Sequence, residues 1–233
     1  MTEPVIHRVT ELDLKVEAWP WPWAAARRAE IEAHFAKCQQ EKPGTWNGRV
    51  LLARHLDVCE GRLSSSYFET DFANFLAWRD WGFPDPGVFN GFGMGALRSA
   101  DGAFVLGEMG GHTVNAGRIY FPAGTPDPED VADGRLDIVG SIAREMEEET
   151  GLTPADYHAA PHWDCVVTPA SIAIFRILDV DMPGDALKAR IEANLARQEH
   201  PELSGIHVVR GRGDFRAGMP RFVTVFLESQ FGA

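Results

Sequence analysis

Hydrophobic positions along the chain follow two periods, and these predict its elements. Apolar residues three and four positions apart predict helices, whereas short alternating or continuous apolar runs between turn residues predict strands. The predicted helices span residues 24–40, 70–81, 138–149, 186–198 and 220–228. The predicted strands span residues 50–53, 62–69, 88–97, 103–106, 117–121, 163–167, 172–180 and 206–209. Strands before, between and after two substantial helices predict an α/β fold of the α+β kind, an α/β/α sandwich around a mixed sheet.

One segment divides the chain by its composition. Residues 82–87 read Gly-Phe-Pro-Asp-Pro-Gly, and this density of glycine and proline is typical of a linker. We therefore predict a smaller N-terminal α+β accessory domain over residues 1–84 and a larger domain over residues 85–233. The length of 233 residues is enough for one large domain or two small ones with a substantial core.

The third predicted helix carries a run of acidic residues. Glu145, Glu148 and Glu149 stand at positions i, i+3 and i+4, so they project from one side of the helix and repel each other. Solvent can offset this repulsion, as on an ordinary acidic surface. A divalent cation that binds several carboxylate oxygens can offset it as well.

The ends and the opposite flank of this helix favour the cation. Asp137 precedes the helix as an N-cap, and Gly151 follows it, where glycine takes the left-handed cap conformation. Ile138, Ile142 and Met146 line the opposite flank at helical spacing, so the helix packs against a core in one orientation. The carboxylates are thereby fixed relative to that core, as a metal site requires.

Charge narrows the choice of partners. The formal net charge of −12 argues against a protein that follows nucleic-acid phosphates, because such a protein needs a basic face. From Pro126 to Glu149, nine acidic and two basic residues give a net charge of −7 in 24 residues. A region this negative repels phosphate groups unless cations are bound, so divalent ions are the expected partners.

The run from Arg144 to Leu152 resembles the second half of the Nudix box, whose consensus is G-x5-E-x7-R-E-U-x-E-E-x-G-U with U aliphatic. Every defined position of that half is matched, by Arg144, Glu145, Met146, Glu148, Glu149, Gly151 and Leu152. The chain is therefore similar to the Nudix hydrolase superfamily. The resemblance implies a Nudix-like sandwich for the larger domain and hydrolysis of a diphosphate (pyrophosphate) linkage.

The first half of the box departs from the consensus. Leu136 stands where a glutamate is expected, and Asp130 stands where a glycine is expected. The strand end 121–124, Phe-Pro-Ala-Gly, resembles the opening of the box; with Gly124 as the box glycine, the following loop is about seven residues longer than the consensus. Asp137 is the acid nearest to the missing glutamate. The chain thus resembles a divergent branch with a long insertion.

The resemblance assigns roles to these residues. It implies that Glu148 and Glu149 are principal ligands of Mg²⁺ or Mn²⁺, and that Glu145 joins them or orients the attacking water. It implies that Arg144 positions a glutamate through a salt bridge. The backbone carbonyl of Gly124 is a further candidate ligand, and the alternative is that glycine serves only the turn. Hard cations of this kind bind carboxylate oxygens and lower the pKa of a bound water.

The implied substrate is a small molecule, a nucleoside diphosphate linked to another moiety of the nucleotide-sugar, CoA or dinucleotide type. The overall layout is more weakly similar to two-part UDP-sugar diphosphatases and to CoA diphosphatases. The alternative to a hydrolase is a catalytically weak Nudix-fold module that binds nucleotides or regulates. Leu136 favours that module, whereas the intact set of three glutamates favours the enzyme.

Five polar residues outside the box are further candidates. Arg118, His112 and Asn115 are candidate substrate-binding residues around the strand end that opens the box. Glu202 and Glu199 are possible general bases from a late loop, and the alternative is an ordinary solvated loop.

The cysteines and the apolar runs bear on location. Cys38, Cys59 and Cys165 are odd in number and have no CxxC or Cys/His ligand spacing, so we expect buried or half-buried free thiols in a reducing cytosol. No apolar run reaches the roughly 18 residues needed to span a bilayer, and the first residues lack an apolar signal core. We expect a cytoplasmic protein without membrane or nucleic-acid partners, and the resemblance favours a homodimer.

Overall fold

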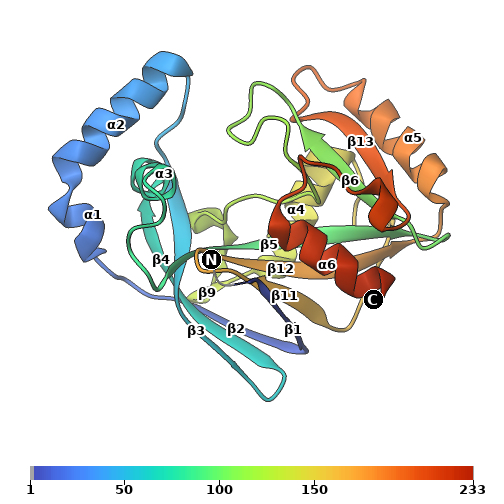
Figure 1. The fold of residues 1–233 in the computed structure, drawn as a ribbon, viewed down its shortest axis with the longest axis horizontal. Helices are drawn as coiled ribbons and strands as arrows, with labels where there is room; N and C mark the ends of the chain where they lie inside the picture. The colour runs from blue at the N-terminus through green and yellow to red at the C-terminus, as the bar shows by residue number, and fades with distance from the viewer. Residues whose placement is uncertain (1–2, 233) are drawn as a thin grey trace.

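The computed structural model describes residues 3–232, in which helices flank a mixed sheet of 13 strands (Figure 1). The strands are β1 (Val5–Val9), β2 (Glu11–Val16), β3 (Arg49–Cys59), β4 (Arg62–Asp71), β5 (Val88–Ser99), β6 (Phe104–Met109), β7 (Ile119–Tyr120), β8 (Val131–Ala132), β9 (Arg135–Leu136), β10 (His158–Ala159), β11 (Trp163–Val167), β12 (Ser171–Val180) and β13 (Leu203–Val209). The helices are α1 (Pro22–Ala26), α2 (Arg28–Glu41), α3 (Phe72–Asp80), α4 (Ile138–Thr150), α5 (Gly184–Leu195) and α6 (Arg221–Phe231), with short 3-10 turns η1 (Pro128–Asp130) and η2 (Arg212–Asp214). The main path of the sheet is β1-β11-β12-β5-β3-β4-β2-β9-β8.

The parallel pair of β5 and β12 lies at the centre of the sheet and brings α4 close to it. A Cβ atom at Gly93 would lie 2.7 Å from the Ile142 side chain, and one at Gly95 would lie 2.3 Å from that of Met146. Glycine at these two positions therefore leaves room for α4 on this face. The apolar flank of α4 that the sequence predicts is the flank that packs here.

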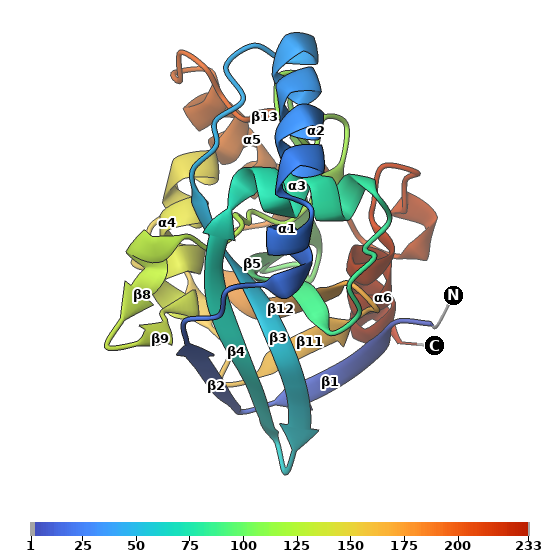
Figure 2. The same cartoon turned by 90° about the vertical axis from the view of Figure 1, so that its left-hand side faces the viewer.

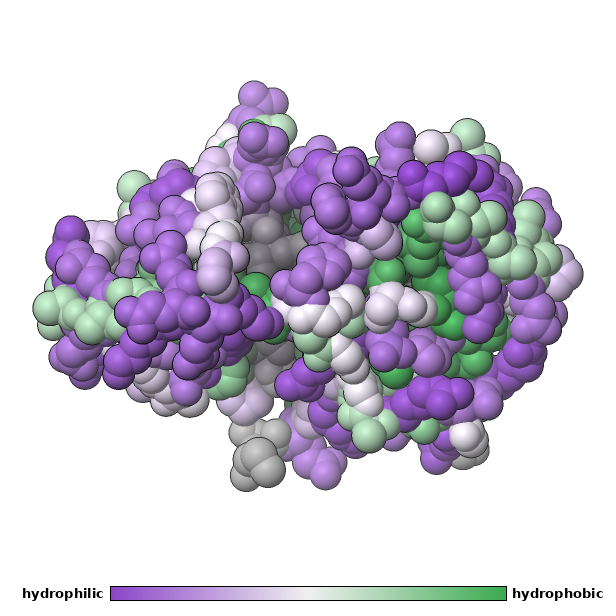
Figure 3. All heavy atoms as spheres, turned by 90° about the horizontal axis from the view of Figure 1, so that it is seen from above, coloured by the Kyte–Doolittle hydropathy of each residue, from purple (hydrophilic) through white to green (hydrophobic). Residues whose placement is uncertain are grey.

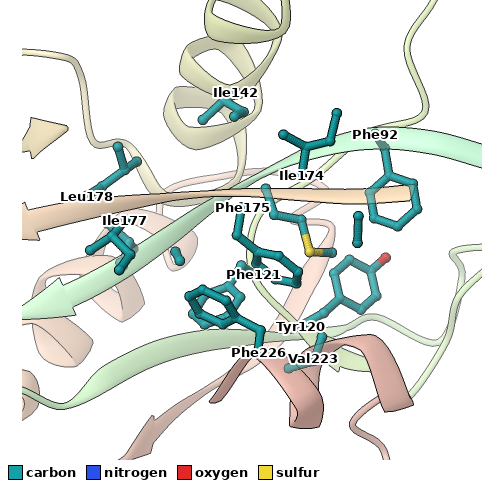
Figure 4. Packing of buried hydrophobic residues seen from close by; sticks show 14 of the residues in the cluster. Phe92, Tyr120, Phe121, Ile142, Ile174, Phe175, Ile177, Leu178, Val223 and Phe226 are labelled. Carbon is teal, nitrogen blue, oxygen red and sulfur yellow. The ribbon is translucent and has the colours of Figure 1, made fainter. Parts of the chain in front are cut away.

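The opposite face of the same two strands packs against α6, because alternate strand residues point to opposite faces. Phe92 of β5 meets Phe222 edge to face, and Phe175 of β12 stacks on Phe226 with ring centroids 4.2 Å apart. Figure 4 shows this aromatic cluster, with Phe121 beside Phe226 and Ile142 on the other side of the sheet. The sheet thus lies between helices, and the predicted α/β/α sandwich with a mixed sheet is confirmed.

The N-terminal helices have a second core. The helix α3 packs on β3 and β4, α2 packs on α3, and α1 adjoins α2; the buried rings of Trp21, Phe68 and Trp78 lie in this core (Figure 2). The strands of residues 1–84 also join the larger sheet. Val5 of β1 pairs with Val167 of β11, and β3 pairs with β5. The division of the chain at residue 84 stays a prediction.

The structure contains elements that the hydrophobic pattern does not predict. The strands β1 and β2 at the N-terminus and the two-residue strands β8, β9 and β10 are additions. The helix predicted at 24–40 is divided at Arg27 into α1 and α2. The expectation of buried or half-buried thiols is wrong for Cys59, which is exposed beside the β3–β4 turn.

Hydrophilic residues dominate the surface seen from above, and hydrophobic residues show at the bottom of its hollows (Figure 3). Among the residues that the structure describes, no helix combines the length and apolar character needed to cross a membrane.

Candidate active site

The helix α4 is fixed at both ends by the residues that the sequence predicts. The carboxylate of Asp137 accepts a hydrogen bond of 3.0 Å from the backbone N–H of Gly140. Gly151 has the left-handed conformation, with φ of 73°, and its N–H donates to the carbonyl of Glu147 at 2.8 Å. These caps satisfy backbone groups that a helix end leaves unpaired, so the acidic last turn is well defined.

The three glutamates of the candidate site extend from the core to the solvent. Glu149 is 4% exposed. The side chain of Glu145 is 14% exposed, and that of Glu148 is 61% exposed. Glu147, in the same run, is exposed and contributes to the field around Tyr157 instead. The helix therefore presents a graded set of three carboxylates, with Glu149 innermost.

Glu149 is a buried acid without a full set of partners. Its Oε2 atom is inaccessible to solvent and has no hydrogen-bond partner. Burial, together with the charges of Glu145, Glu202 and Glu148, raises the pKa of Glu149 to about 9, although a hydrogen bond from the Ala123 backbone lowers it. A buried unpaired carboxylate is costly, so this oxygen is suited to a cation.

Glu145 lies against the strand end that opens the candidate box. A Cβ atom at Gly124 would lie 2.3 Å from Oε1 of Glu145, so only glycine leaves room for the carboxylate there. The pKa of Glu145 is raised to about 7, chiefly by burial; the charge of Arg144 lowers it and that of Glu148 raises it. The structure thereby brings together Gly124 and Glu145, which are 21 positions apart in the sequence.

Arg144 connects the acidic helix to the inserted loop. Its Nη1 donates to Glu145 at 2.8 Å, and its Nη2 donates to Asp130 at 3.1 Å. Asp130 is buried, and its Oδ2 also accepts from the backbone N–H of Asp127 at 3.2 Å. In the sequence alone, Asp130 is only a departure from the glycine of the consensus. The pattern Asp127-Pro-Glu-Asp, a capping box, is the signal that could have identified its structural role.

The insertion between Gly124 and Asp137 folds as the turn η1 and the small hairpin of β8 and β9. Lys15 of β2 pairs with Arg135 of β9, so the insertion extends the sheet. Leu136 is buried in the main core, and Asp137 is occupied as the cap of α4. Leu136 thus offers no carboxylate in place of the missing glutamate, and the carboxylate of Asp137 is engaged with the backbone N–H of Gly140.

A cavity of about 370 Å³ adjoins this site. Its wall includes Ala123 and Gly124 of the strand end, together with the candidate residues Asn115 and Arg118. The amide of Asn115 donates to the hydroxyl of Tyr120, another wall residue, at 3.1 Å. The wall also contains two arginines and four phenylalanines that the sequence does not identify as candidates. They are Arg79, Arg221, Phe75, Phe83, Phe92 and Phe222.

The three remaining candidates, Glu202, Glu199 and His112, differ in how they relate to the carboxylates and to the cavity. Glu202 is exposed, yet its charge raises the pKa of both Glu145 and Glu149, and its carbonyl accepts from Gly110 N–H at 2.7 Å. Glu199 lies exposed in the preceding loop. His112 is exposed with its ring beside Gly110, outside the wall of the cavity. Glu202 is thus the possible base whose charge acts on both Glu145 and Glu149.

The chemistry of the glutamates fits a hard divalent cation, since all the donors are oxygens and one is buried without a partner. In residues 3–232, the carboxylate oxygens of Glu145, Glu148 and Glu149 do not all lie within 4.8 Å of one another. Within residues 3–232, the only three His, Cys, Asp or Glu donors that all lie within 4.8 Å of one another are those of His34, Cys38 and Asp80. The side chain of Glu148 is 61% exposed and lies 3.6 Å from Nη1 of Arg144.

No family model and no curated protein matches this chain. Among solved structures, it is similar to a MutT protein from Methanosarcina mazei Go1, with 20% identity and a TM-score of 0.39 over 63% of this chain and 94% of that one. It is also similar to RenU, a Nudix hydrolase from M. smegmatis, with 12% identity and a TM-score of 0.38 over 60% of this chain and 83% of that one. Both are proteins of the class that the run from Arg144 to Leu152 resembles.

Proposed function

We propose that this chain is a Nudix-type hydrolase that uses a divalent cation, Mg²⁺ or Mn²⁺, to cleave the diphosphate linkage of a nucleoside diphosphate derivative. The observation that carries the proposal is the buried, unpartnered Oε2 of Glu149 beside Glu145, on a helix whose sequence matches the second half of the box. Carboxylates that raise each other's pKa in this way are a common feature of functional sites.

In this proposal Glu148 and Glu149 are the principal ligands, and Glu145 joins them or orients the water. The carbonyl of Gly124, next to Glu145, is the further candidate ligand. When bound, the cation supplies Lewis-acid chemistry and a water of lowered pKa. Arg144 holds Glu145 in place through its 2.8 Å contact while its other nitrogen is anchored on Asp130.

The adjoining cavity supports the substrate class. Its phenylalanine rings offer faces on which a base can stack, and Arg79, Arg118 and Arg221 offer charges for phosphate oxygens. These features are next to Gly124, on the side where a diphosphate would meet the carboxylates. The volume of about 370 Å³ is within the range of small-molecule sites, roughly 300–1,000 Å³.

A binding or regulatory module with weak catalysis is the second candidate. The observation in its favour is that Leu136 is buried in the core and Asp137 is engaged as a helix cap. The site consequently has one acid fewer than the box consensus at this point.

A substrate panel separates the two candidates. UDP-sugars, ADP-ribose, NADH and CoA are incubated with the protein in Mg²⁺ or Mn²⁺, and the released monophosphates are measured, with a chelator as the control. We expect metal-dependent release from at least one of them. Tight binding of one compound without turnover of any would support the module and contradict the hydrolase for this panel.

A further inference from the structure

A second group of metal-ligand side chains lies between two N-terminal helices, away from the acidic helix. His34 and Cys38 are four residues apart on α2, so they share one face of that helix. Asp80 is the last residue of α3, which packs beside α2. One donor atom from each of the three lies within 4.8 Å of the other two.

The contacts within the group converge on one nitrogen atom. The Nε2 atom of His34 lies 2.9 Å from Oδ2 of Asp80 and 3.6 Å from Sγ of Cys38. A Cys-His-Asp relay for nucleophilic catalysis needs the thiol and the carboxylate on opposite ring nitrogens. This arrangement is therefore not a relay. Three donors that all lie within 4.8 Å of one another are close enough to bind one cation.

The spacing of the donors is close to that of a tetrahedral site. Zinc lies about 2.3 Å from sulfur and about 2.0–2.1 Å from nitrogen or oxygen, so neighbouring ligands of a tetrahedral zinc are roughly 3.3–3.6 Å apart. The observed 3.6 Å between Sγ and Nε2 matches this, and the 2.9 Å between Nε2 and Oδ2 needs only a small opening.

The surroundings hold the donors in position. Nε of Arg79 donates to Oδ1 of Asp80 at 2.9 Å, which leaves Oδ2 directed at His34. The ring of His34 packs against Trp81 with centroids 5.6 Å apart. The side chains of His34 and Asp80 are 22% and 30% exposed, so a fourth position is open to water. Supporting contacts of this kind orient metal ligands.

We propose that His34, Cys38 and Asp80 form a site for zinc, with three protein ligands and one solvent ligand, that clamps α2 to α3. A thiolate and an imidazole select zinc over Mg²⁺, which prefers oxygen ligands. None of its three ligands belongs to the proposed hydrolase site. The site does affect the cavity beside that site, because α3 contributes Phe75 and Arg79 to the cavity wall.

Cobalt is the probe, because Co²⁺ in a thiolate site gives a near-ultraviolet charge-transfer band that carboxylate sites do not give. The full chain is freed of metal with a chelator, reduced, and titrated with Co²⁺, and Zn²⁺ is then added in competition. We expect the band to saturate at one Co²⁺ per chain and to disappear on addition of Zn²⁺. We also expect Zn²⁺ to raise the Tm of the wild-type chain.

Matched variants assign the ligands. Cys38→Ser should abolish the band, whereas Cys59→Ser, at the exposed cysteine, should keep it. Asp80→Asn keeps the shape of the side chain and should weaken Co²⁺ binding by more than about 10-fold, since even outer-shell partners contribute 10–100-fold. Circular dichroism checks that each variant is folded. No band in the wild type, a band that survives Cys38→Ser, or a band lost in folded Cys59→Ser would overturn the proposal.

Discussion

The guanidinium of Arg144 donates to both carboxylate oxygens of Asp130, at 3.1 and 3.3 Å. This pair joins the acidic helix to the insertion that separates the chain from the box consensus. Asp130 is buried and Arg144 also contacts Glu145, so the insertion helps to set the position of a candidate catalytic carboxylate. The divergent loop is thus part of the site's support.

Replacing Asp130 with asparagine tests this support. Asp130→Asn leaves Arg144 without its buried counter-charge and should lower the free energy of unfolding by about 1–3 kcal/mol, measured by urea denaturation. Asp133→Asn, in the exposed β8–β9 turn of the same insertion, is the control and should change it by less than about 0.5 kcal/mol. Equal effects of the two variants would show that the ion pair contributes nothing particular.

The parts of the structure that the sequence predicts are those with local determinants. The caps Asp137 and Gly151 and the spacing of the apolar flank all lie within α4, so its limits and its buried face follow from the pattern. The acidic run predicts carboxylates on one side for the same reason. Their unequal burial, from Glu149 inward to Glu148 outward, depends on what packs against the helix and is not in the pattern.

The parts that sequence reasoning misses depend on distant partners. The strand β1 is short, with only Val5, Ile6 and Val9 apolar, and it is fixed by its pairing with β11, with Val9 opposite Trp163. Asp80 lies 42 positions beyond Cys38, so no ligand spacing links them, and only the packing of α3 on α2 does so. The cavity residues Arg79 and Arg221 are likewise brought together from positions 142 residues apart.

Gly124 provides a test by steric exclusion. In Gly124→Ala the new methyl group would occupy the space of the Glu145 carboxylate, 2.3 Å from Oε1. That carboxylate is the end of a flexible side chain, so the fold should tolerate the change while metal-dependent turnover falls by about 10-fold or more. Gly111→Ala, which meets nothing within 4 Å, is the control. Steady-state rates measure this. Full activity in Gly124→Ala would show that the position of the Glu145 carboxylate does not matter for the reaction.

Asp137 has two possible roles that different substitutions distinguish. As an N-cap only, Asp137→Ala should cost about 1 kcal/mol of stability, and Asp137→Ser should restore most of it, because serine also caps. Turnover of both folded variants should match that of the wild type. A large loss of turnover in Asp137→Ser, with stability kept, would instead mean that this carboxylate replaces the missing glutamate of the box.

Glu149 predicts an unusual dependence of stability on pH in the metal-free protein. Its pKa is raised to about 9 from an ordinary value of 4.5, so the folded state binds this proton more tightly than the unfolded state does. The stability associated with it is therefore complete below pH 4.5 and declines as the pH rises toward 9.

Glu149→Gln removes that decline. In EDTA at pH 8 the variant should be more stable than the wild type, by on the order of 2 kcal/mol, whereas near pH 5 the two should differ little. Chemical denaturation at both pH values measures this. An unchanged or lower stability of Glu149→Gln at pH 8 would contradict the burial of an unpaired acid at this position.

The most direct test of the proposed function is the rate of metal-dependent hydrolysis in two matched variants of one helix. Glu149→Gln and Glu147→Gln each replace one carboxyl group of the same acidic run by an amide, but Glu149 is buried in the candidate site and Glu147 is exposed outside it. With the best substrate of the panel and saturating Mn²⁺, Glu149→Gln should lower kcat by at least about 100-fold, as expected for loss of a metal ligand. Glu147→Gln should keep the wild-type rate. Equal rates in the two variants, both folded, would contradict the metal site and the function built on it.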